Sequence, residues 1–256
     1  MGIMNERRAI ERSSKARPVR IEDIGAQLEV RRHPGARRLT LRISRTRRAV
    51  IVTIPVQCDL DEAGSFLNRH IDWVRARLDS LPNQVNFEHA AAMPLRGIPH
   101  TISLAENKRT HLISIESRSG QRPVIIVPGN HDLASGLLTR WLFDEARRDL
   151  EASVARHADL LSLKAKRIAV RDQTSRWGSC STAGALSFSW RLILAPPFVL
   201  HYVAAHEVAH LAEMNHGPDF WALVKKIRPD FEAAKQWLQV RGPDLHRYGP
   251  AHGRGR

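Results

Sequence analysis

The sequence predicts an α+β protein in which a β-rich N-terminal region precedes a domain of helices packed with a small mixed sheet. Three observations support this prediction. Runs of alternating polar and apolar residues, typical of half-buried strands, occur mainly before residue 128. A stretch with helical periodicity then extends from about His131 to Ser162. Beyond it, short apolar runs alternate with helical patterns up to about residue 245.

The N-terminal region begins with a charged segment, and we expect residues 1–18 to form a basic flexible arm. Within residues 19–56, the runs IGAQLEV, RRLTLRIS and AVIVTIP have strand patterns, and SRTRR joins the last two as a hairpin. Residues 60–80 predict one amphipathic helix with Leu67, Ile71, Val74 and Leu78 on its apolar face. Further short strands are expected at Pro99–Leu104, His111–Ile115 and Val124–Val127.

The second part of the chain is expected to carry the chemistry. After the long helix, strands are predicted at Arg167–Val170 and Leu186–Leu194, and Pro196-Pro197 ends the second strand. We therefore place a β-rich region with one helix at 19–128, a catalytic domain at 129–245 and a C-terminal tail at 246–256. No internal repeat is evident.

A metal-binding motif lies in this domain. His206, Glu207 and His210 form H-E-x-x-H, and histidines four residues apart share one helix face, where they can bind one zinc ion. The glutamate beside the first histidine can hold the water that zinc activates. The preceding run PFVLHYVAA is apolar enough for a buried helix. The motif predicts a zinc-dependent hydrolase, most readily a peptidase.

The third ligand requires a break in the helix. A continuous helix would place His216 about 9 Å along the axis from His210 and on another face. The segment 214–218, MNHGP, contains residues that end one helix and start the next, so we favour His216 as the third ligand. Glu213, one turn past His210, is the main alternative. Weaker alternatives are Asp219, Asp230 and Glu232.

The stretch from about Arg171 to Leu238 carries several motifs in order: R-W-G-S-C, S-W-R-L followed by Pro, Y-V-x-x-H-E-x-x-H and N-H-x-x-x-F-W. It resembles the YgjP-like metallopeptidase domain, which is related to the SprT and WLM groups. The resemblance implies a zincin-like fold, Zn²⁺ held by His206, His210 and His216, and Glu207 as general base. The histidine spacing also equals that of metzincins, but Glu213 replaces their glycine, so we do not assign that group.

Other residues have possible roles near the site. Trp177 and Cys180 are expected in a loop between two strands, as packing residues. By resemblance, the strand Ser187–Leu194 would hold extended substrate through its backbone. Tyr202, Tyr248 and His246 are candidates for stabilising an oxyanion.

The chain is strongly basic, with a net charge of +14 from 40 Lys and Arg against 26 Asp and Glu. This charge suggests an anionic partner or a genome that favours arginine. Residues 31–48 contain no acid, and Arg38, Arg42, Arg45 and Arg47 could contact nucleic acid from a solvent-facing strand surface. No aromatic residues lie among them, which argues against binding of single strands.

The expected partner is a polypeptide substrate. Two other classes remain open: a DNA-associated protein with a structural or auxiliary zinc site, and an amidase that acts on a non-peptide substrate. No run is long enough to cross a membrane, and the N-terminus lacks an apolar signal core. Together with only two cysteines, Cys58 and Cys180, this predicts a cytoplasmic protein. The oligomeric state stays open.

Overall fold

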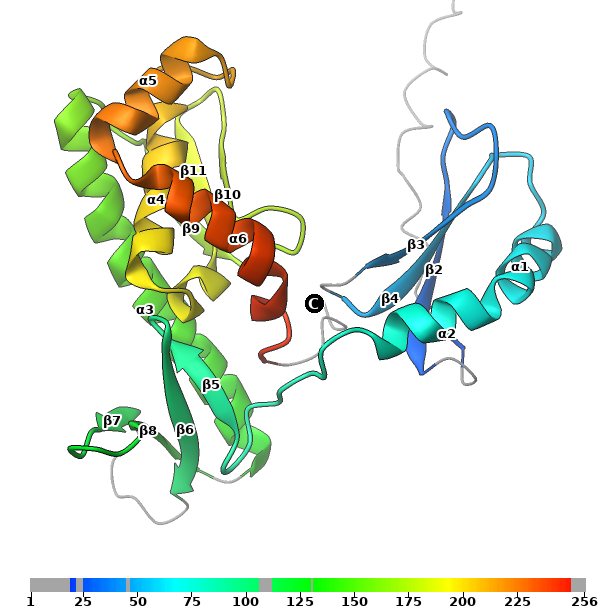
Figure 1. Ribbon diagram of the computed structural model, residues 1–256, viewed down its shortest axis with the longest axis horizontal. Coiled ribbons are helices and arrows are strands. Elements are labelled where there is room, and N and C mark those ends of the chain that lie inside the picture. The colour runs from blue at the N-terminus through cyan, green and yellow to red at the C-terminus, as the bar shows by residue number, and fades with distance from the viewer. Residues whose placement is uncertain (1–18, 22–24, 45–46, 106–111, 130, 250–256) are drawn as a thin grey trace, which may run out of the picture. The chain divides into compact units, whose positions relative to one another are not determined.

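The computed structural model describes residues 19–21, 25–44, 47–105, 112–129 and 131–249 (Figure 1). The predicted basic arm, Arg45 and the end of the predicted tail lie outside the described residues. The chain forms two compact units, Met1–Pro82 and Asn83–Arg256. Six α-helices and small mixed sheets among the described residues make the fold α+β, as predicted.

The first unit is a four-stranded sheet with two helices. Its strand order is β1-β2-β4-β3, in which β2 and β4 are parallel and the other pairs are antiparallel. Alternate residues of the central strand β4, such as Val50, Val52 and Ile54, join the buried apolar cluster. The bounds are β1 Val19–Ile21, β2 Ala26–Arg32, β3 Thr40–Ser44, β4 Ala49–Ile54, α1 Leu60–Arg69 and α2 Ile71–Asp79.

The single helix predicted at 60–80 is therefore two helices, and His70 separates them. In a continuous helix, the carbonyl of Phe66 would accept the backbone N–H of His70. Here Nδ1 of the His70 ring lies 2.9 Å from that carbonyl oxygen, and the His70 N–H bonds to Leu67 instead, at 3.0 Å. The side chain competes with the backbone and tightens the turn.

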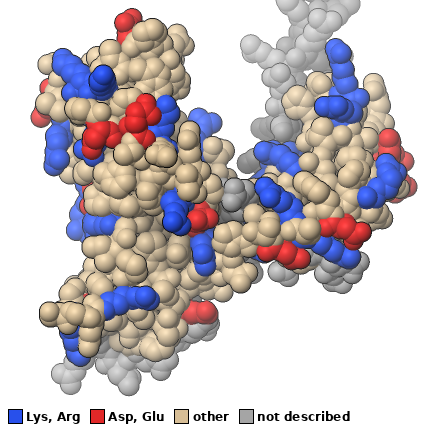
Figure 2. All heavy atoms as spheres, in the orientation of Figure 1, with Lys and Arg blue, Asp and Glu red and all other residues tan. Residues whose placement is uncertain are grey.

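The predicted alternation along β3 is confirmed. Leu41 and Ile43 pack against the core of the first unit, whereas Arg38 and Arg42 are exposed. Arg47 differs from them, because its Nη2 lies 2.8 Å from Oε2 of Glu29. Figure 2 shows basic side chains of both units interspersed with acidic and uncharged ones. The basic surface predicted from sequence is thus partly neutralised at Arg47.

The second unit contains two sheets and four α-helices. One sheet has the order β5-β6-β8-β7, and the other has the order β10-β11-β9. The bounds are β5 Ala92–Leu95, β6 Ile98–Ala105, β7 Ser114–Glu116, β8 Val124–Pro128, α3 His131–Leu161, β9 Arg167–Arg171, β10 Gly178–Cys180, β11 Ala185–Ser189, the 3₁₀ helix η2 Trp190–Leu194, α4 Pro197–Ala209, α5 Pro218–Ile227 and α6 Phe231–Leu245.

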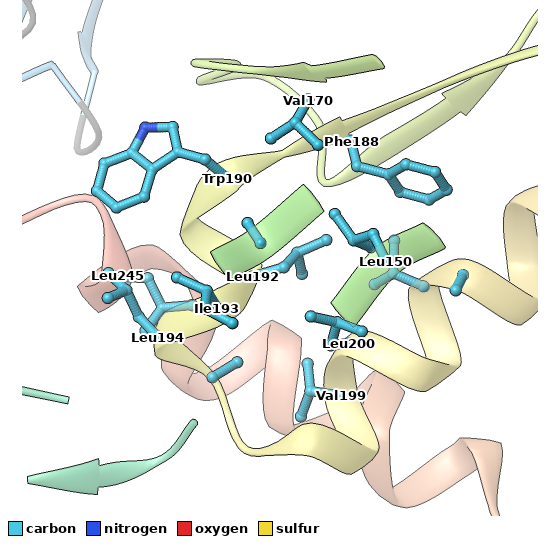
Figure 3. Packing of buried hydrophobic residues seen from close by; sticks show 14 of the residues in the cluster. Leu150, Val170, Phe188, Trp190, Leu192, Ile193, Leu194, Val199, Leu200 and Leu245 are labelled. Carbon is cyan, nitrogen blue, oxygen red and sulfur yellow. The ribbon is translucent and has the colours of Figure 1, made fainter. Parts of the chain in front are cut away.

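One apolar core holds this second unit together. Figure 3 shows Phe188, Leu192, Leu150 and Val199 converging from β11, η2, α3 and α4. The sheet β5–β8 belongs to the same core, since Ile125 and its neighbours share the buried cluster with α3. This shared core places the division between compact units after Pro82, whereas the sequence suggested a boundary near residue 128.

The two four-stranded sheets have the same topology. In each, the outer pairs are antiparallel and the inner pair is parallel. A helix follows the second strand of the parallel pair, which is β4 in one sheet and β8 in the other. This repeat is not evident in the sequence, because the two segments share only a short pattern that spans the end of that strand and the start of its helix. It reads I-P-x-x-x-D-L at 54–60 and V-P-x-x-x-D-L at 127–133.

Two strand predictions near the motif helix were wrong. The strand predicted to extend to Leu194 ends at Ser189, and the segment WRLIL continues as a fully buried 3₁₀ helix. The segment Gly178–Cys180, expected to be loop, is strand β10, which pairs antiparallel with β11. Apolar runs do not distinguish a buried strand from a buried helical turn, which explains the first error.

Candidate metal centre

A hairpin tip fixes the start of the motif helix α4. Between β5 and β6, the N–H of Arg96 donates to the carbonyl of Ile193 at 2.7 Å, and that of Gly97 donates to Leu194 at 3.1 Å. Gly97 has a φ of +77°, and a Cβ there would lie 2.9 Å from Cα of Pro196. Only glycine fits this close approach, which anchors η2 directly before α4.

The helix α4 breaks before His216, as predicted, but earlier than the segment 214–218 that the sequence suggested. It ends at Ala209, and His210 is its C-terminal cap. The N–H of Glu213 still donates to Ala209, at 3.0 Å, and a tight turn at Asn215–Gly217 leads to α5. This turn returns His216 to the motif.

The structure brings the three predicted ligands together. One donor atom from each of His206, His210 and His216 lies within 4.8 Å of the other two. The Nε2 atoms of His206 and His216 are 3.1 Å apart. Among the described residues, this is the group of His, Cys, Asp and Glu side chains whose spacing suits a metal ion.

Phe220 packs against all three imidazoles. Its ring centroid is 4.9 Å from that of His206, 4.4 Å from that of His210 and 4.8 Å from that of His216. Phe220 is fully buried on α5, so it packs beneath the three rings and restricts their movement. Residue type and spacing did not predict this role. The signal lies in the F-W pair of the N-H-x-x-x-F-W motif, which is in the first turn of α5.

His206 and His210 are held in the neutral form that binds metals. Burial lowers the pKa of His206 to about 3, with help from His210 and His216. Burial also lowers the pKa of His210. Nδ1 of His210 lies 2.9 Å from the backbone carbonyl of Glu213, so the ring donates its N–H there and leaves Nε2 for a ligand.

Glu213, the main alternative ligand, thus contacts His210 through its main chain. Two of the weaker alternatives lie beside cations: Asp230 is 3.2 Å from Nε of Arg228, and Glu232 is 3.8 Å from Nζ of Lys235. These contacts favour the three-histidine set.

The residues present fit a zinc ion. Zinc binds imidazole nitrogen at about 2.0–2.1 Å in tetrahedral geometry, which places neighbouring donors roughly 3.4 Å apart. The 3.1 Å separation of the Nε2 atoms of His206 and His216 is close to that value. Neutral imidazoles are also the donors that zinc commonly takes.

Glu207 is buried beside the cluster, with 5% of its surface exposed. Burial raises the pKa of this carboxyl to about 8, and the charge of Arg176 opposes the shift. Its side chain lies against Gly178 of strand β10. A cation bound by the histidines would favour the ionised carboxylate.

The other candidate residues have varied positions. The Tyr202 ring lies 5.9 Å from that of His206 and stacks on Phe231, and burial raises its pKa to about 12. Tyr248 instead pairs with Val85 in an isolated bridge. Trp177 and His246 lie against each other, with ring centroids 5.0 Å apart. Cys58 and Cys180 are both free thiols.

An α+β protein with a buried H-E-x-x-H helix and a third histidine after a turn belongs structurally with the zinc-hydrolase class. The family model described as YgjP-like, metallopeptidase domain, matches residues 37–241. The chain belongs to this YgjP-like family, whose description implies a metal ion.

Comparison with curated proteins gives no match. Among solved structures, the metallopeptidase zymogen abylysin of Pyrococcus abyssi is distantly similar, with a TM-score of 0.34 and 22% identity over 40% of this chain and 99% of that one. No helix among the described residues combines the length and apolar character needed to span a membrane.

Proposed function

We propose that the protein is a zinc-dependent peptidase in which His206, His210 and His216 bind the metal and Glu207 is the general base. The observation that carries this proposal is the convergence of three imidazoles, whose donor atoms lie within 4.8 Å of one another, beside a buried carboxyl group. Membership of a metallopeptidase family supports the same activity.

Zinc at such a site supplies a Lewis acid that activates water at neutral pH. Glu207 accepts the proton of the attacking water at a carboxylate oxygen and delivers it to the leaving nitrogen. The carbonyl of Glu213 keeps His210 in the ligating tautomer, and Phe220 holds the three rings in place. The same site geometry serves an amidase, so the identity of the substrate needs a direct test.

The strand next to the site supports an extended polypeptide as substrate. The strand favoured from sequence, β11, lies in the middle of its sheet, and β10 is an edge strand beside the motif helix. Hydrogen bonds from Ser189 to Trp177 and from Ser181 to Ala185 set the register. In this register the backbone groups of Gly178 and Cys180 point away from β11, where a substrate strand can pair with them.

A proteome-wide digest tests the activity. Zinc-loaded protein is incubated with a denatured proteome, with and without DNA, and new termini are identified by mass spectrometry. We expect new internal termini that are absent from a Glu207→Gln digest. Activity on small amides without new protein termini would favour the amidase. Tight, salt-sensitive DNA binding without hydrolysis would favour the DNA-associated alternative.

A further inference from the structure

The glycine of the R-W-G-S-C motif lies where no side chain fits. A Cβ at Gly178 would lie 2.5 Å from Oε1, 2.6 Å from Cγ and 2.8 Å from Cδ of Glu207. Gly178 does not have a positive φ, and it lies in strand β10. Backbone conformation therefore does not require glycine here, and the contact with Glu207 does.

The contact involves the stem of the Glu207 side chain as well as its tip. Rotation of the carboxyl group alone would leave Cγ within 2.6 Å of the new Cβ, so the whole side chain would have to swing. Glu207 is 5% exposed on a buried helix, which leaves it little room. A methyl group at position 178 would thus displace the carboxylate.

The register of β10 directs Gly178 toward the motif helix. Gly178 pairs with Phe188 and Cys180 pairs with Leu186, and both partners point into the apolar core. Paired residues lie on the same face of a sheet, so Gly178 and Cys180 face the core side as well. The alternation leaves Ser179 on the opposite face.

We propose that Gly178 is a positioning residue for Glu207: the missing side chain at position 178 sets where the general base lies. The inference rests on the proposed function, in which Glu207 moves the proton. The contact with Glu207 also gives the glycine of the R-W-G-S-C motif a physical role that the motif alone does not reveal.

Kinetics of Gly178→Ala are the first test. We expect the variant to keep its zinc content, and kcat to fall at least tenfold with little change in KM, since the metal ligands and the edge backbone remain. Gly136→Ala is the matched control. It adds the same methyl group on α3, where nothing lies within 4 Å, and should keep wild-type kcat. An unchanged kcat in Gly178→Ala would overturn the inference.

A double-mutant cycle tests whether the effect acts through Glu207. Alanine at position 207 has neither Cγ nor a carboxyl group, so a methyl group at position 178 has nothing there to collide with. Adding Gly178→Ala to Glu207→Ala should therefore lower the residual kcat at least threefold less than adding it to the wild type lowers the full kcat. Equal losses in the two backgrounds would show that the methyl group acts elsewhere and would overturn the proposal.

A crystal structure of metal-free Gly178→Ala gives a readout that is independent of hydrolysis. We expect the Glu207 side chain to be displaced from β10. A Glu207 that keeps its place, with the strand shifted instead, would contradict the inference even if the protein is an active peptidase. Conversely, a displaced Glu207 with no peptidase activity in the wild type would refute the proposed function alone.

Discussion

The Nε2 atoms of His206 and His216 lie 3.1 Å apart, although a turn and the end of a helix separate the two residues in sequence. This approach exists because α4 ends at Ala209 and α5 begins at Pro218. Phe220, on the new helix, then packs against both rings. The cluster of three histidines is therefore built by helix termination as much as by the H-E-x-x-H motif.

The first prediction concerns the ligands. His206→Ala, His210→Ala and His216→Ala should each lower zinc content well below the one ion per chain expected of the wild type, because a site with two imidazoles loses much of its affinity. Elemental analysis after gel filtration measures this. Glu213→Ala is the control and should keep its zinc, since its backbone carbonyl remains to orient His210. Zinc lost from Glu213→Ala but kept in His216→Ala would assign the third ligand to Glu213.

The convergence of the three histidines was predictable because the information for it is local in the sequence. Helical spacing relates His206 to His210, and turn-forming residues explain the return of His216. The place of Glu207 against Gly178 and the packing of Phe220 were not predictable in that way. Both depend on contacts between elements distant in sequence, which periodicity does not report.

The second prediction concerns the hairpin tip that anchors the start of α4. Gly97→Ala should lower the free energy of unfolding by about 2–4 kcal/mol, because the methyl group adds a collision with Pro196 to the strain of a positive φ. Urea denaturation measures the loss. Gly120→Ala is a matched control: its φ is +76°, yet nothing lies within 4 Å, so only about 1 kcal/mol should be lost. Equal losses at the two glycines would remove the proposed anchoring contact.

The third prediction concerns acid stability. Burial lowers the pKa of His157 to about 4, and the charges of His201, Arg228 and Arg156 add to the shift. A group whose pKa is lower in the folded state favours folding above its unfolded pKa and loses that contribution as pH falls. The titration of His157 should therefore lower the free energy of unfolding of the metal-free protein by about 2 kcal/mol between pH 7 and pH 5.

Urea unfolding at both pH values measures this dependence. His157→Gln cannot titrate, so its stability should fall by about 2 kcal/mol less than that of the wild type over the same interval. The comparison cancels other titrating groups. Identical pH dependence in both proteins would mean that His157 does not remain neutral in the folded state.

The fourth prediction concerns the basic strand surface. If Arg38, Arg42, Arg45 and Arg47 contact DNA phosphates, replacing all four with Ser should flatten the dependence of log Kd on log salt. Arg47 should contribute least, because it already pairs with Glu29. Gel-shift titrations at several salt concentrations measure the slope. If the wild-type protein shifts no DNA at low salt, the basic charge reflects amino-acid composition and not DNA binding.

The fold class was predictable from the sequence, whereas the break between two helices and the boundary between the two units were less so. Alternating runs gave most strands, and a helical run gave α3, because each pattern reflects one buried face. The break at His70 depends on a single side chain that competes for a backbone carbonyl. The unit boundary after Pro82 depends on which helix covers the sheet β5–β8, and a linear pattern does not contain that choice.

The proposed mechanism requires Glu207 to move the proton in a metal-dependent hydrolysis. Glu207→Gln keeps the size and polarity of the side chain but cannot accept the proton. Peptide cleavage by this variant and by wild type, at equal measured zinc content, is the most direct measurement. We expect the variant to retain zinc and its kcat to fall roughly 100-fold or more, the scale expected on loss of a general base. A variant that cleaves at the wild-type rate would contradict the proposed mechanism.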